Sequence, residues 1–80
     1  MITVSRASEL VKEYSPKSNP KSIFDFSNNE YLVFAPEDEH AIETPFFTVN
    51  KNSEKVSYFN PGMDIDSFND AIEKGPIKEF

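Results

Sequence analysis

An 80-residue chain without a single cysteine has no disulfide to hold its fold together. Disulfides and cysteine-based zinc sites are excluded, although many natural domains of this size depend on one or the other. The chain instead has eight phenylalanines and three tyrosines, which bury large areas when they enter a core. Because disordered chains are poor in such residues, we expect one folded domain that spans residues 1–80.

Amphipathic patterns predict one helix near each end of the chain. From about residue 5 to residue 14, apolar side chains recur at i, i+3, i+4 and i+7, and a proline follows. The second helix is expected to begin after Asp64 and to end at Gly75. Its expected buried stripe consists of Ile65, Phe68 and Ile72, with Ala71 beside them. The tail beyond it is expected to be tied down by Ile77 or Phe80, or else frayed.

Four strands are predicted between the helices. They span residues 22–26, 30–35, 46–50 and 55–59. Asn28 and Asn29 tolerate the left-handed backbone that a short turn between the first two strands requires. In the hairpin that joins the last two strands, the side chains expected to share a face are Phe47, Val49, Val56 and Tyr58. The predicted fold class is α+β, an antiparallel meander in the order α-β-β-β-β-α with both helices on one face of the sheet.

Charge is distributed unevenly along the chain. Residues 1–22 carry four basic and two acidic side chains, a balance of +2, whereas residues 23–80 carry twelve acidic side chains against four lysines, a balance of −8. A surface this negative repels nucleic-acid backbones and anionic membranes. We therefore expect a basic protein partner, with no direct contact to nucleic acid or membrane.

Few side chains in this sequence suit catalysis or metal binding. His40, the one histidine, lies among Glu37, Asp38, Glu39 and Glu43, which could raise its pKa or bind a divalent cation with it. The alternative is a solvated acidic loop that keeps a sheet edge soluble. We favour this alternative because nothing fixes the geometry of neighbouring carboxylates on a proline-flanked loop.

A second acidic stretch begins at Asp64 and also has two interpretations. It starts like a calcium loop, with aspartates at the first and third positions, but lacks glycine at the sixth and glutamate at the twelfth. An aspartate-rich helix start explains it more simply.

With only two glycines in the chain, a glycine-rich phosphate loop is also excluded. We expect no metal, no cofactor and no enzymatic activity.

The sequence also bears on location and on exposed aromatic residues. The start of the chain lacks the features of a secretory signal, and the longest apolar run, Tyr31–Ala35, is far too short to span a bilayer. A cytoplasmic location is expected.

With helices on one face only, Phe46 and Phe59, or Tyr31, would lie on the open face of the sheet as a partner-binding patch, unless loops cover it.

Three segments, Glu30–Pro36, Pro45–Val56 and Phe59–Pro61, together resemble a layout in small proteins from phages, prophages and polymorphic-toxin loci, immunity proteins among them. In that layout a Tyr-Leu-hydrophobic strand precedes a Pro-Phe-aromatic hairpin, and a helix with a phenylalanine follows. Glu54 stands where those proteins have a glycine, which predicts a wider hairpin loop. The resemblance, over residues 22–72, implies a mobile-element protein, and it supplies no catalytic residues to carry over to this chain.

Two classes of function fit these patterns. An inhibitor or immunity-type protein would block a basic site on a toxin, nuclease or defence protein through its acidic residues. A structural component of a phage particle would instead dock on larger virion proteins through exposed aromatic side chains. We favour the inhibitor because the charge asymmetry is the stronger signal. The predicted partner-binding residues are Glu37, Asp38, Glu39, Glu43, Asp64, Asp66, Asp70, Phe46 and Phe59.

Overall fold

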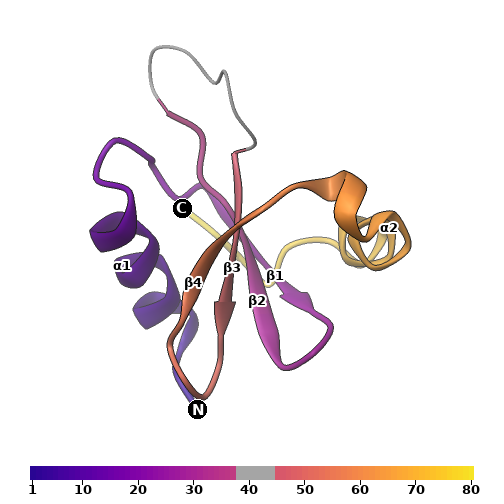
Figure 1. Cartoon of the computed structure of the whole chain (residues 1–80), viewed down its shortest axis with the longest axis horizontal. Coiled ribbons are helices and arrows are strands. Elements are labelled where there is room, and N and C mark those ends of the chain that lie inside the picture. Colours follow the sequence, from indigo (N-terminus) through magenta and orange to yellow (C-terminus); the bar gives the residue numbers. More distant parts are fainter. Residues whose placement is uncertain (38–44) are drawn as a thin grey trace.

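The computed structural model describes residues 1–37 and 45–80, which form three layers with a sheet in the middle (Figure 1). In these ranges the elements are α1 (Val4–Tyr14), β1 (Ser22–Phe26), β2 (Glu30–Phe34), β3 (Phe46–Asn50), β4 (Val56–Phe59), the 3-10 helix η1 (Pro61–Met63), α2 (Ile65–Lys74) and β5 (Lys78–Glu79). The described strands are all antiparallel to their neighbours, in the order β4-β3-β2-β1-β5. The α+β class and the order of helix, strands and helix are confirmed.

The two helices cover opposite faces of the sheet, so the prediction of both helices on one face is wrong (Figure 1). The buried residues on the α1 face are Ala7, Val11, Ile23, Tyr31, Val33, Ala35, Phe47 and Val49. Those on the α2 face are Phe24, Phe26, Leu32, Phe59 and Ala71. Successive side chains of a strand point to opposite faces, and these strands are apolar on both. A single helical layer would have left one apolar face in water, and the second helix covers it.

The α1 face holds the larger core. Phe47 is its largest fully buried side chain, with 1% of its surface exposed. Its ring lies 5.0 Å from that of Tyr58 and 6.2 Å from that of Tyr14, centroid to centroid. The strand pairing places Phe47 opposite Tyr58 and Val49 opposite Val56, which confirms that these four side chains share a face of the sheet.

Helix α2 buries fewer of its residues against the sheet than α1 does. The stripe that it buries also differs from the prediction. Ala71, 3% exposed, is its buried residue, while Phe68 is half-buried with its ring 5.0 Å from that of Phe46. Ile65 and Ile72 remain 50% and 42% exposed. At 3.6 residues per turn, the two isoleucines lie about a quarter-turn from the direction that Phe68 and Ala71 share. The helix has rotated so that the phenylalanine and the small alanine meet the sheet.

The tail forms a fifth strand, which the strand patterns did not predict. The Ile77 amide donates to the Ile23 carbonyl at 2.8 Å, and the Phe80 amide donates to the Lys21 carbonyl at 2.9 Å. The side chains of Ile77 and Phe80 are both exposed. The backbone amides of Ile77 and Phe80 therefore hold the tail against β1, as expected of one or the other residue, and the alternative of a frayed tail is wrong.

The β1–β2 turn and the β3–β4 loop both contain residues with left-handed backbone. Asn28 and Asn29 each have φ 59°, as predicted for the turn between β1 and β2. In the β3–β4 loop, Glu54 has φ 63°. Its carboxylate accepts a hydrogen bond from Arg6 Nε at 3.2 Å, which ties the hairpin to α1.

Gly75→Ala should destabilise the protein by about 1–3 kcal/mol through backbone strain alone. Gly75 ends α2 at φ 84° and ψ 167°, a conformation almost confined to glycine. A Cβ added there would meet no atom within 4 Å, so steric overlap with neighbours does not contribute. Urea unfolding of the variant measures the loss. Gly62→Ala, at a position without positive φ, is the matched control, and equal losses would contradict the strain argument.

Candidate functional site

The three predicted acidic residues of the C-terminal helix have different environments. Asp64 caps the helix, its Oδ1 accepting from the Ser67 amide at 3.2 Å, as expected for a helix start. Asp70 forms an ion pair with Lys74 at 3.1 Å. Asp66 is exposed, and no described cation lies within ion-pair distance of it. Of the three, Asp66 is therefore the most available to a partner.

The predicted acidic loop lies mostly outside the described residues. Asp38, Glu39 and Glu43 fall there, together with His40. Glu37 is exposed and forms a β-bridge with Ser18 in the loop that follows α1. Binding by this loop stays a prediction.

The predicted aromatic patch is not on the surface. Phe59 is only 6% exposed and Phe46 is half-buried, because α2 covers this face of the sheet. Their rings belong to a continuous series between the sheet and α2, with neighbouring centroids 5.0–6.3 Å apart, that contains Phe26, Phe59, Phe68, Phe46 and Phe34. Tyr31 is buried on the other face, and its hydroxyl donates to the Ile2 carbonyl at 3.2 Å. The expectation that these residues form an open-face patch is therefore wrong.

The exposed part of α2 combines acidic and apolar side chains. Asp66 and Glu73 are both exposed and seven residues apart, so they lie in one line along the helix, here called the acidic row. Ile65 and Ile72, each one residue earlier, form a parallel isoleucine row. We call the two rows together the α2 outer face. Sequence reasoning missed the isoleucine row because the helical period alone made it the buried stripe.

Exposed apolar residues are concentrated around this helix. Of the eight large hydrophobic residues exposed in the described chain, four lie within residues 63–77. These are Met63, Ile65, Ile72 and Ile77. Clustered exposed apolar side chains bordered by polar ones are typical of interaction surfaces. The α2 outer face is therefore the best candidate site.

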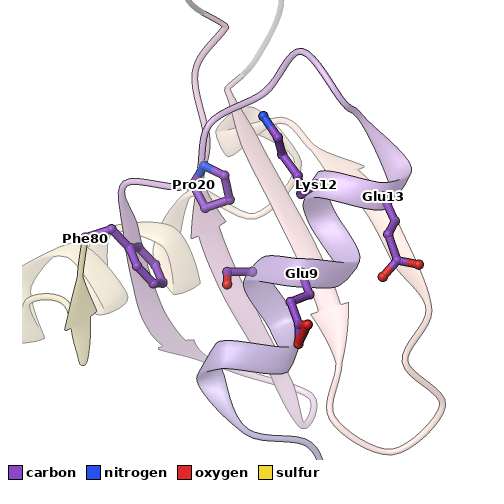
Figure 2. Close-up of a pocket in the computed structure, with 6 residues that line it drawn as sticks. Glu9, Lys12, Glu13, Pro20 and Phe80 are labelled. Atoms are coloured by element: carbon purple, nitrogen blue, oxygen red, sulfur yellow. The ribbon is translucent and has the colours of Figure 1, made fainter.

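A second candidate is a groove of about 520 Å³ beside α1 (Figure 2). It is lined by Ser8, Glu9, Lys12, Glu13, Pro20 and Phe80. The Lys12 ammonium is occupied, since it donates to the Ser18 carbonyl at 3.2 Å and to Asn19 Oδ1 at 3.1 Å. Glu13 is paired with Arg6 at 3.3 Å. Because two of its three charged groups already have partners, the groove is a weaker candidate than the α2 outer face.

One carboxyl in the described chain has a pKa shifted by its surroundings. Partial burial at the start of β2 raises the pKa of Glu30 above its ordinary value, and a hydrogen bond from the Thr48 side chain opposes this shift. The proton is therefore held more tightly in the folded state than in the unfolded state. The stability that Glu30 contributes is fully present below its unfolded pKa and is lost as the pH rises through its folded pKa.

Glu30→Gln should therefore stabilise the protein at neutral pH, because it removes a half-buried charge and keeps a group that can bond to Thr48. The advantage should shrink as the pH falls below the folded pKa of Glu30, where the native carboxyl is itself neutral. Melting temperatures of both proteins between neutral pH and about pH 4 test this. Glu79→Gln, at an exposed glutamate, is the control. A constant difference across the series would contradict the assignment.

The described residues hold no group of three or more His, Asp or Glu side chains that could bind a metal ion. Neither of their two longer helices has the length and apolar character needed to cross a membrane.

Comparison of the chain with known protein families, with curated proteins and with solved structures finds no match.

Proposed function

We propose that this protein is a non-enzymatic binding module that holds a basic partner protein against the α2 outer face. Its role would be that of an inhibitor or immunity-type protein, covering a basic site on a toxin, nuclease or defence protein. The observation that carries the proposal is the pairing of an exposed acidic row with an exposed isoleucine row on one helix.

The two rows have complementary physical roles. The helix and its cap carry Asp64, Asp66, Asp70 and Glu73 against the single cation of Lys74. This local charge steers a basic partner to the surface and speeds association at low salt. The isoleucines supply apolar area that becomes buried on contact and slows dissociation. The mobile-element setting rests on the hairpin resemblance alone.

The alternative, a structural module of a phage particle, depended on exposed Phe46 and Phe59. Since α2 covers these rings, this alternative has lost its predicted surface. It would now require salt-tolerant binding through the isoleucine row.

Capture of partners from a host lysate, at low and at high salt, distinguishes the two functions. We expect the native chain to retain a basic protein that salt elutes, and the Asp66→Asn/Glu73→Gln variant to retain much less of it. Glu9→Gln/Glu79→Gln removes the same two charges elsewhere and should bind like the native chain. Equal, salt-independent capture by all three proteins would contradict the proposal.

A further inference from the structure

The spacing within the α2 outer face restricts the shape of what can dock there. In each row the two side chains are seven residues apart, which is about 10.5 Å along the helix axis at 1.5 Å per residue. The two rows are offset by one residue, which is about 100° around the helix, so the carboxylates flank the isoleucine row roughly a quarter-turn away. A partner that contacts both isoleucines and both carboxylates at once must present two apolar groups and two basic groups, each pair about 10.5 Å apart.

An extended peptide fits this repeat poorly. Side chains on one face of a strand are about 6.7 or 13.4 Å apart, since every second residue points the same way. A helix presents residues i and i+7 on one face at about 10.5 Å, the same spacing as the rows of α2. The spacing therefore favours a helix over a strand.

The carboxylates on the α2 outer face determine the second property of the partner, which is the sign of its charge. Asp66 and Glu73 flank the isoleucine row, and no described cation lies within ion-pair distance of them. The nearby Lys74 ammonium is engaged by Asp70 at 3.1 Å. A helix docked on the isoleucine row thus has two carboxylates at its flank, which suit lysine or arginine and disfavour acidic side chains.

We infer that the α2 outer face binds an amphipathic basic helix of the partner, with an apolar row seated on Ile65 and Ile72 and a basic row beside Asp66 and Glu73. This inference rests on the proposed function and specifies its partner. It places recognition on exposed residues of α2 and leaves Phe68 and Ala71 holding the helix to the sheet.

Two synthetic peptides of equal composition test the inference. Each has about 18 residues, long enough for a helix to form on binding. In the patterned peptide, leucines recur every seventh residue with lysines on both sides of that row. In the scrambled peptide, the same leucines and lysines are spread around the helix. Fluorescence anisotropy measures the affinity of each for the native chain at physiological ionic strength.

We expect the patterned peptide to bind about tenfold more tightly than the scrambled one, because it alone covers both isoleucines. The variant Ile65→Gln/Ile72→Gln should abolish this preference. Because glutamine is a good helix former, the substitutions remove the apolar row without breaking the helix. Asp66→Asn/Glu73→Gln should weaken both peptides, and Glu9→Gln/Glu79→Gln should change neither.

Three results would overturn the inference. Equal affinity for the two peptides would mean that only charge attracts them, which removes the helical partner but leaves a basic partner possible. A third peptide, in which leucine and lysine alternate strictly, would indicate an extended partner if it bound more tightly than the patterned peptide. Failure of the patterned peptide to bind at all would also overturn it, while the proposed function would still be decided by the capture experiment.

Discussion

Phe47→Ala is expected to lower the free energy of unfolding by about 3–5 kcal/mol, as large-to-small changes at fully buried aromatic positions do. The Phe47 ring lies between α1 and the sheet, in contact with Tyr14 and Tyr58. A loss of this size is comparable to the whole stability of many 80-residue domains. We therefore expect a largely unfolded variant at 37 °C, visible by circular dichroism and by the loss of dispersion in an NMR spectrum.

Phe34→Ala is the matched control, because it removes the same atoms from a half-buried position on the α2 face. With its ring partly exposed, the cost should be clearly smaller than for Phe47. Equal losses in urea titrations would show that the two faces do not differ in packing as described here.

Ala71→Asp is expected to destabilise the protein by about 3–5 kcal/mol, because it places an uncompensated charge at the contact between α2 and the sheet. Since Ala71 is the buried residue of this helix, α2 should lose its amide protection first, and the rings beneath it should become accessible. Hydrogen exchange followed by mass spectrometry resolves this order.

Asn69→Asp adds the same charge to the same helix at an exposed position. It should change the free energy of unfolding by less than about 0.5 kcal/mol, as most surface substitutions do. If Asn69→Asp lowers the free energy of unfolding as much as Ala71→Asp does, the loss comes from adding a charge to the helix and not from burying it. Unchanged exchange in Ala71→Asp would contradict the docking of α2 through this residue.

Much of the local structure could be predicted because its causes lie within a few residues. The first strand, from Ser22 to Phe26, follows from alternating side chains, and the Asn28-Asn29 turn follows from the backbone that asparagine tolerates. Gly75 ends the second helix where expected. In each case the deciding interaction is local, so the sequence pattern was sufficient.

The candidate site was predicted only in part. Asp66 and Asp70 are exposed on α2 as expected, but Asp64 is engaged as a cap and Phe59 is in the core. The isoleucine row was missed altogether. Amphipathic periodicity identifies which residues share a stripe, yet it does not say how far the helix rotates once it meets a particular surface.

Sequence alone thus accounts for the helices, four of the five described strands, the turns and the excess of acidic side chains, because these depend on neighbouring residues or on composition. Tertiary packing decided which face each helix covers, that the tail pairs with β1, and that Ile65 and Ile72 stay exposed. Those outcomes depend on contacts between residues far apart in the chain. A strand that is apolar on both faces needs a cover on each side, but only the assembled sheet determines which helix supplies it.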